Sequence, residues 1–259
     1  MKKNKLKEIV SKGGVAVGTC IYSFSPAIIE VAGFVGVDFC RIDNEHAWRQ
    51  DESVDNVIRG AFCSDIVPLL RIDRDNPHLV RKAFEAGAGG VIVPHISTRQ
   101  EAEAIVQAAK FPPIGKRGYG GLCFSAQWGI KAGVEWMEWC NNETLVIPMA
   151  EDTEAVAHID SIMATEGVDA IFFGPADFSI SAGVPLQTGH AKVTDALKKV
   201  IESAKKHGKF VITTTGFPYA DNARKLAEMG AQAIEIGHDV TILATIWKNA
   251  LNEIRGSKK

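Results

Sequence analysis

The sequence predicts an α/β protein in which residues 1–259 form a single (β/α)8 barrel, the TIM barrel, with an N-terminal helix. Eight short apolar segments, rich in Val and Ile, alternate with amphipathic helical segments. That composition is typical of parallel strands buried on both faces. A glycine closes the helical segment before four of these strands, at Gly36, Gly87, Gly167 and Gly230. An open doubly wound sheet is the alternative, but it usually carries a glycine-rich phosphate turn after its first strand, which is missing here.

The eight expected strands follow one another along the chain. They are residues 14–21, 37–43, 66–71, 90–94, 144–149, 170–174, 210–214 and 233–237. The third contains Pro68, which would remove one donor from the strand ladder. A helix is expected between the third and fourth strands, with Asn76 as N-cap, Pro77 at the first helical position and Gly87 as its stop.

Composition excludes several classes of protein. The net charge of −2 is spread in short alternating runs, which gives no reason to expect nucleic acid or an anionic membrane as a partner. No apolar stretch reaches the roughly 18 residues of a membrane span. The basic start, residues 1–10, predicts a surface helix and not a signal peptide, because no long apolar segment follows it. Five cysteines without a C-x-x-C pair favour a reduced, cytoplasmic protein.

Two carboxylates, Glu151 and Asp177, follow neighbouring predicted strands. In a barrel they would lie side by side at the mouth, where the carboxyl ends of the strands meet. Two such groups about 4 Å apart repel by roughly 4 kcal/mol at an effective dielectric constant near 20. A divalent cation is the usual way to balance them. The same edge is expected to carry Arg71 and the segment 42–46, which contains Asp43 and His46.

These residues resemble those of the HpcH/HpaI family of metal-dependent (class II) pyruvate aldolases, which includes the 2-keto-3-deoxy sugar-acid aldolases. The likeness runs from about Gly18 to Gly183 and resumes near Leu226. The motifs that carry it are Ile42-Asp-Asn-Glu-His-Ala, Phe111-Pro-Pro-Ile-Gly-Lys-Arg-Gly, the segment 167–179 with Gly-Pro-Ala-Asp, and the segment 230–237.

The resemblance implies a carbon–carbon lyase that reversibly cleaves a 4-hydroxy-2-oxo acid to pyruvate and an aldehyde through a metal-stabilised enolate. Glu151 and Asp177 would hold Mg²⁺, Mn²⁺ or Co²⁺. Arg71 would steady the keto oxygen and carboxylate, and backbone N–H groups of the turn from Gly174 through Ala176 to Asp177 would cradle that carboxylate. His46 would be the acid/base, through a water, oriented by Asp43. An imidazole suits that role because its ordinary pKa is about 6.5.

Two positions depart from the family pattern. Met149 stands where the family commonly has a glutamine, and Glu85 stands where many members have an aspartate that bonds the histidine. Family members assemble as hexamers in which the last helix packs on a neighbour, and Trp128, Trp136 and Trp139 are predicted here to form a subunit contact. We expect Glu45 to support its loop, and His95, at the end of the fourth strand, to be a packing or hydrogen-bonding residue outside the chemistry.

Three other functions remain open on the sequence. A Schiff-base aldolase would need a lysine facing the cavity, and only the loop residues Lys116 and Lys131 could reach it. A citryl- or malyl-CoA-type lyase would need a nucleotide site, for which no basic cluster stands out. A non-catalytic ketoacid-binding barrel is suggested by Met149 and Glu85.

Overall fold

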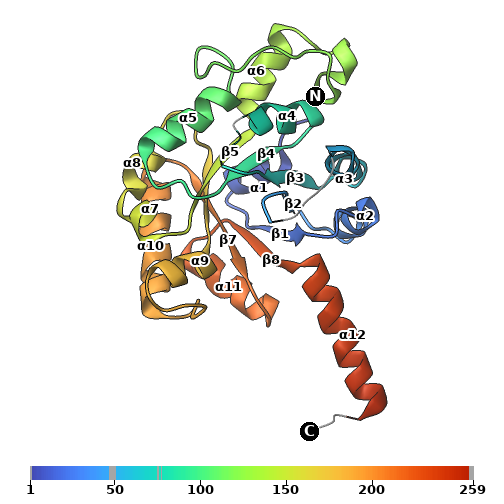
Figure 1. The fold of residues 1–259 in the computed structure, drawn as a ribbon, viewed down its shortest axis with the longest axis vertical. Coiled ribbons are helices and arrows are strands. Elements are labelled where there is room, and N and C mark those ends of the chain that lie inside the picture. Colours follow the sequence, from blue (N-terminus) through green and yellow to red (C-terminus); the bar gives the residue numbers. More distant parts are fainter. Residues whose placement is uncertain (1, 47–50, 75, 77, 257–259) are drawn as a thin grey trace.

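The computed structural model describes residues 2–46, 51–74, 76 and 78–256, and it confirms the predicted barrel. Eight parallel strands pair in chain order, and the eighth closes the ring on the first (Figure 1). The strands are β1 Ala16–Ile21, β2 Phe39–Asp43, β3 Val67–Arg71, β4 Gly90–Val93, β5 Leu145–Ala150, β6 Ala170–Phe173, β7 Phe210–Thr215 and β8 Ala233–His238.

Helices surround this ring. They are α1 Lys5–Ser11, α2 Pro26–Phe34, α3 Asp51–Cys63, α4 His78–Ala86, α5 Arg99–Ala109, the 3-10 helix η1 Phe124–Gly129, α6 Val134–Glu143, α7 Thr153–Ala157, α8 Ile159–Met163, α9 Pro175–Ser181, α10 Ala191–Lys206, α11 Tyr219–Met229 and α12 Asp239–Arg255. Gly87 follows α4 with φ +105°, as expected of a helix stop, whereas Pro77 lies outside the described residues. None of the helices in the described part of the chain has the length and apolar character of a membrane span.

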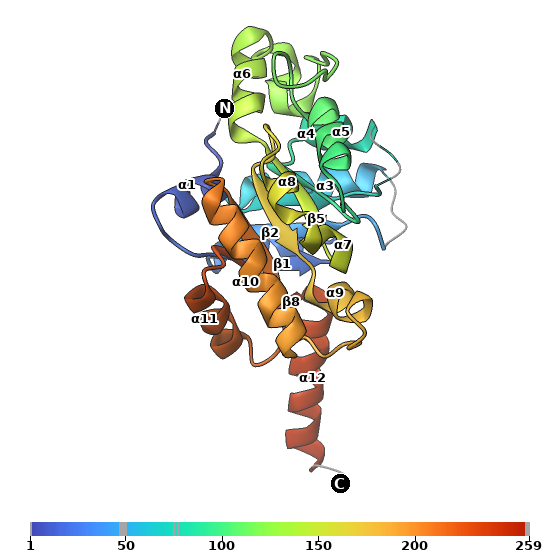
Figure 2. The same ribbon diagram turned by 90° about the vertical axis from the view of Figure 1, so that its left-hand side faces the viewer.

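The last helix, α12, leaves the barrel. Both views show it pointing away from the other elements, with the C-terminus at its far end (Figures 1 and 2). Its contacts are with β1 and β8, next to its own start.

Apolar side chains fill the lower part of the barrel, below the mouth. Alternate strand residues point inward and pack together; they include Phe39, Leu69, Ile92, Ile147, Phe172 and Ile212. Gly18 on β1 leaves room for one of them, because a Cβ at this position would lie 2.4 Å from the Phe39 ring. The lower barrel is therefore a packed core and not a channel.

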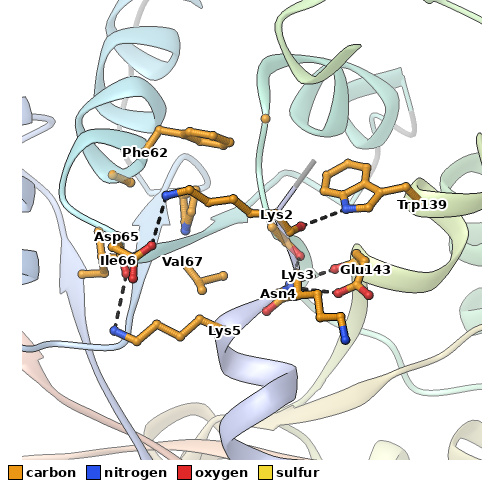
Figure 3. Close-up of a pocket in the computed structure, with 14 residues that line it drawn as sticks. Lys2, Lys3, Asn4, Lys5, Phe62, Asp65, Ile66, Val67, Trp139 and Glu143 are labelled. Carbon is orange, nitrogen blue, oxygen red and sulfur yellow. Dashed lines mark hydrogen bonds and ion pairs between the residues drawn. The ribbon is translucent and has the colours of Figure 1, made fainter. Parts of the chain in front are cut away.

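The N-terminal segment closes the lower end of the barrel. Leu6 of α1 is fully buried among the inward-facing side chains. Asn4 caps α1 by accepting from the Lys7 N–H, and its side-chain amide donates to the Gly89 and Glu143 carbonyl oxygens at 2.9 Å each. Figure 3 shows Asn4 and Glu143 with Trp139, which donates to the Lys2 carbonyl oxygen at 2.8 Å. The start of the chain is thus tied to β4 and α6.

Pro68 fits into β3 because of where the strand ladder begins. In a parallel sheet the N–H and C=O of one residue face the same neighbouring strand. The Pro68 carbonyl accepts from the Gly89 N–H, so its missing N–H would face the same side, ahead of the point where β4 starts at Gly90. The N–H that proline lacks would therefore lie at the end of the strand ladder and not within it.

The long segment between α5 and β5 forms a small core of its own. Arg117, from the Pro-Pro-Ile-Gly-Lys-Arg-Gly motif, is buried with its guanidinium facing the rings of Phe84, Phe111 and Trp136 at 5.4, 4.6 and 5.3 Å. The prediction that Trp136 forms a subunit contact is wrong, because this side chain is fully buried within its own chain. Trp128, by contrast, is 65% exposed.

Replacement of Asn4 by alanine should lower the free energy of unfolding by about 1–3 kcal/mol, because the change removes a helix cap and two buried side-chain hydrogen bonds. Urea unfolding followed by circular dichroism measures the difference. Lys3→Ala, at the exposed neighbouring position, is the matched control and should change the value by less than about 0.5 kcal/mol. Equal unfolding midpoints for Asn4→Ala and the wild type would show that the N-terminal segment does not hold the barrel end.

Candidate active site

The mouth of the barrel brings together the side chains that the sequence singles out. Asp43 and Arg71 are the last residues of β2 and β3, and they are partners across that ladder. Glu151 directly follows β5, and Asp177 lies in the first turn of α9, which begins right after β6. Because β5 and β6 are neighbours, as are β2 and β3, these residues form an acidic side and an arginine-containing side of one mouth.

Glu151 and Asp177 form the acidic side. Glu151 is 3% exposed and Asp177 is open to solvent. Burial raises the pKa of Glu151 to about 6, and the charges of Asp177 and Glu45 act in the same direction, against an opposing effect of His95. Gly174, the N-cap of α9, lets the Glu151 side chain lie close to the start of this helix, because a Cβ at Gly174 would lie 3.3 Å from Glu151 Oε2. Asp177 is therefore near enough for its charge to destabilise the ionised form of Glu151.

Such a pair fits a divalent cation. Carboxylate oxygens are the ligands that Mg²⁺ and Mn²⁺ prefer. A cation would also relieve the effect that raises the pKa of Glu151, since it would stabilise the ionised carboxylate. Glu151 and Asp177 are therefore the residues that could hold a metal here.

His95 also belongs to this site, although we expected a packing or hydrogen-bonding residue outside the chemistry. It lies just after β4, and its backbone N–H donates to Glu151 Oε1 at 2.8 Å. Its ring nitrogens lie 3.0 Å from Glu151 Oε1 (Nδ1) and 3.6 Å from Glu45 Oε1 (Nε2). The signal that could have identified it was its position at a strand end, which is the criterion that selected the other site residues.

A buried series of alternating charges crosses the mouth from β8 to β4. Arg41 donates to both oxygens of Glu235, at 2.7 and 2.8 Å, and to Asp43 Oδ2 at 2.7 Å. Arg71 contacts the same Asp43 oxygen and places Nη1 3.0 Å from Glu45 Oε2. Burial alone would raise the pKa of Asp43, but the two arginines outweigh that effect and leave its pKa below the ordinary value.

The predicted acid/base residue, His46, stands at the edge of this series. Asp43 Oδ1 accepts from its backbone N–H at 3.2 Å, so the contact between them fixes the loop. The His46 ring is 57% exposed, and its Nε2 lies 3.7 Å from Glu45 Oε2. The buried Nε of Arg71 has no hydrogen-bond partner in the structure. That N–H is a free donor at the mouth.

A cavity of about 560 Å³ adjoins the site on the side of β7 and β8. Ala176 lies at one side of it, and Thr214, Thr215, Tyr219 and His238 contribute polar groups to the lining. The remaining lining is mostly apolar and includes Val193, Leu197, Leu226 and Met229.

Another group of possible metal ligands lies deeper in the mouth. Within the described residues, ligand atoms of Cys20, Glu235 and His238 lie within 4.8 Å of one another. Both oxygens of Glu235 are already bound by Arg41, whose positive charge would repel a cation. Burial raises the pKa of the Cys20 thiol, which keeps it protonated. This group does not suit a metal.

The two departures from the family pattern lie in different places. Met149 is buried in the barrel interior next to Gly174 and brings no polar group to the acidic side. Glu85 lies against Gly120 of the long loop, where its Oε1 is buried without a hydrogen-bond partner. The lysines considered for a Schiff base, Lys116 and Lys131, are both exposed to solvent.

Comparisons with known proteins give a consistent result. The sequence model of the HpcH/HpaI aldolase/citrate lyase family matches residues 17–245. A curated relative named 2-keto-3-deoxy-L-rhamnonate aldolase, from Klebsiella pneumoniae, is 29% identical over 92% of this chain and 88% of its own length. A crystal structure of an HpcH/HpaI aldolase/citrate lyase family protein from Burkholderia cenocepacia superposes with a TM-score of 0.90, 30% identity and coverage of 98% and 100%. The structure of citrate synthase SbnG has a TM-score of 0.86, 30% identity and 98% coverage of each chain.

The raised pKa of Glu151 predicts how cation binding depends on pH. The carboxyl must lose its proton to bind a cation, so the apparent Mn²⁺ affinity should be constant above about pH 6. Below that value it should fall about tenfold for each pH unit. The apparent affinity is measured by titrating the protein with Mn²⁺ at several pH values between 5 and 8 and following free Mn²⁺ by electron paramagnetic resonance. Glu151→Gln should bind Mn²⁺ weakly with a flat profile over this range; a wild-type affinity that does not change between pH 7 and 5 would contradict the assignment.

Proposed function

Because this chain belongs to the HpcH/HpaI aldolase/citrate lyase family and is thereby a carbon–carbon lyase, we propose that it is a divalent-metal-dependent aldolase. It reversibly cleaves a 4-hydroxy-2-oxo acid into pyruvate and an aldehyde. The observation that carries the proposal is the pair of Glu151 and Asp177 at the same mouth as the arginine-containing side with Arg71. One domain, residues 1–259, contains the whole site.

Glu151 and Asp177 would hold the cation, which would be Mg²⁺, Mn²⁺ or Co²⁺. Its positive charge would stabilise the negative charge that develops on the keto oxygen of the 2-oxo acid. Because Glu151 is buried, little water surrounds its carboxylate. Charges at this site are therefore screened less, which strengthens the stabilisation of the developing negative charge.

Arg71 and the start of α9 orient the 2-oxo acid. Two guanidinium nitrogens of Arg71 are fixed by Asp43 and Glu45, and its unpaired Nε–H donates to the substrate. The substrate carboxylate lies at the turn from Gly174 through Ala176 to Asp177, where first-turn N–H groups have no partner within the helix.

His46 moves the proton. In the cleavage direction it accepts the proton of the 4-hydroxyl group, directly or through a water, and the C3–C4 bond then breaks. The electron pair of that bond moves toward the keto group, the aldehyde leaves, and C3 takes up a proton to become the methyl group of pyruvate. Asp43 holds the His46 backbone, and Glu45 lies beside the His46 ring.

The alternatives from the sequence are less favoured. A citryl- or malyl-CoA-type lyase and a non-catalytic barrel both conflict with curated relatives of nearly equal length that are named aldolases. Because the chain is also similar to citrate synthase SbnG, the test below includes a second assay. That assay is the condensation of acetyl-CoA with oxaloacetate to citrate.

Exchange of the pyruvate methyl protons into D₂O, followed by NMR, tests the reaction. The wild type should exchange them only with added divalent cation, and His46→Ala should slow exchange by about 100- to 10,000-fold. His207→Ala, at the C-cap of α10, is the control and should retain the rate. Cation-independent exchange, or citrate formation from acetyl-CoA and oxaloacetate without pyruvate exchange, would replace this proposal with another.

The protein acts as a homo-oligomer, for which α12 supplies a contact. Ile246, Trp247, Leu251 and Ile254 are 58%, 64%, 43% and 80% exposed. At 100° per residue they fall within roughly 140° of the helix circumference, which makes one apolar face. A second copy of this chain covers that face, as in the hexamers of the family.

Its compartment is the cytoplasm. All five cysteines are free thiols, and four of them are buried. An odd number of unpaired cysteines is typical of a reducing environment.

Trp247→Glu should lower the molecular mass in solution, measured by light scattering after gel filtration, because it places a charge on the apolar face of α12. Asn249→Glu adds the same charge about 130° from the centre of that face, and it should leave the mass unchanged. Monomeric wild-type protein, or equal masses for the wild type and Trp247→Glu, would argue against this contact.

A further inference from the structure

His95 has a backbone conformation that needs an explanation. Its φ is +55°, in the left-handed region that residues with a Cβ seldom adopt. Two hydrogen bonds hold it there: the His95 N–H donates to Glu151 Oε1 at 2.8 Å, and Arg74 Nη1 donates to the His95 carbonyl at 2.7 Å. Strained residues that the surrounding structure fixes so firmly cluster at functional sites.

The ring of His95 adds a second contact to the same carboxylate oxygen. Its Nδ1 lies 3.0 Å from Glu151 Oε1, which already accepts the backbone N–H. Glu151 Oε2 faces Gly174, the first residue of the turn that carries Asp177. One oxygen of Glu151 is therefore held by His95, and the other lies next to Gly174, at the start of the turn that carries Asp177.

The far side of the ring meets the arginine side of the mouth. His95 Nε2 lies 3.6 Å from Glu45 Oε1, an ion-pair distance longer than a hydrogen bond, and Glu45 Oε2 lies 3.0 Å from Arg71 Nη1. His95 thus lies between the cation-holding acid and the residues that orient the 2-oxo acid.

We propose that His95 is a positioning residue that fixes Glu151 so that it offers a cation one oxygen, Oε2. This inference rests on the proposed function, because it concerns the cation held by Glu151 and Asp177. A carboxylate fixed in this way favours the small octahedral ions Mg²⁺ and Mn²⁺ over Ca²⁺, which often takes both oxygens of one carboxylate. His95 therefore contributes to metal selectivity through Glu151, without contacting the metal itself.

Three substitutions at this position distinguish the contribution of the His95 ring from that of the left-handed backbone. His95→Gly removes the ring and accepts the left-handed conformation freely. His95→Asn also tolerates this conformation and places an amide N–H near the position of Nδ1, facing Glu151. His95→Gln places its amide near the position of Nε2, facing Glu45. Mn²⁺ affinity is measured by electron paramagnetic resonance, and Mg²⁺ and Ca²⁺ affinities by competition, without substrate.

His95→Gly should weaken Mn²⁺ binding by about 10- to 100-fold, the usual effect of losing a residue that orients a metal ligand. The preference for Mg²⁺ over Ca²⁺ should narrow in the same variant, because Glu151 Oε1 loses the ring contact and keeps only the backbone N–H of residue 95. His95→Asn should restore both values to within a few-fold of the wild type, and His95→Gln should not.

Unchanged Mn²⁺ affinity and selectivity in His95→Gly would overturn the proposal, as would rescue by His95→Gln in place of His95→Asn. Either result, combined with cation-dependent pyruvate exchange by the wild type, would leave the aldolase assignment intact. A wild type that binds no divalent cation would overturn the proposed function together with this inference.

Discussion

The active-site mouth depends on a mostly buried series of groups in which carboxylates alternate with arginines and, at one end, with the half-exposed ring of His95. Burial of an isolated charge is strongly unfavourable, so a series of this kind persists only if every member has a partner. In order from β8 to β5 its members are Glu235, Arg41, Asp43, Arg71, Glu45, His95 and Glu151. Its last member, Glu151, has the acid Asp177 as its neighbour. The alternation therefore fails at one point, and that point is where a cation is needed.

Much of this site could be predicted from residue positions. Glu151, Asp177, Asp43 and Arg71 all follow or end a Val- and Ile-rich segment, and the carboxyl ends of parallel strands meet at one mouth. The eight-strand barrel follows from the same alternation of segments. The barrel and the positions of these residues at its mouth are predictable because strand order and burial are encoded locally, in composition and spacing; the roles of the residues stay predictions.

Other parts depend on contacts between distant segments. Arg41 and Glu235 meet because β2 and β8 both flank β1, which no local pattern indicates. His95 owes its left-handed backbone to Glu151 and Arg74, which lie 56 and 21 residues away in the sequence. Trp136 resembles a surface aromatic in the sequence, yet Arg117 and Phe111 enclose it. In each case tertiary packing decides the role of a residue whose own segment is uninformative.

The filled lower barrel, closed by α1, has a kinetic consequence. With the interior packed by side chains such as Leu6 and Phe39, ligands pass through one opening. In the proposed reaction the 2-oxo acid is held against Glu151 and the aldehyde lies nearer the entrance, over the cavity of β7 and β8. Products would then depart in sequence, aldehyde before pyruvate, and pyruvate would be the first to enter in the synthetic direction. Such an ordered mechanism gives pyruvate and the aldehyde distinct patterns of product inhibition.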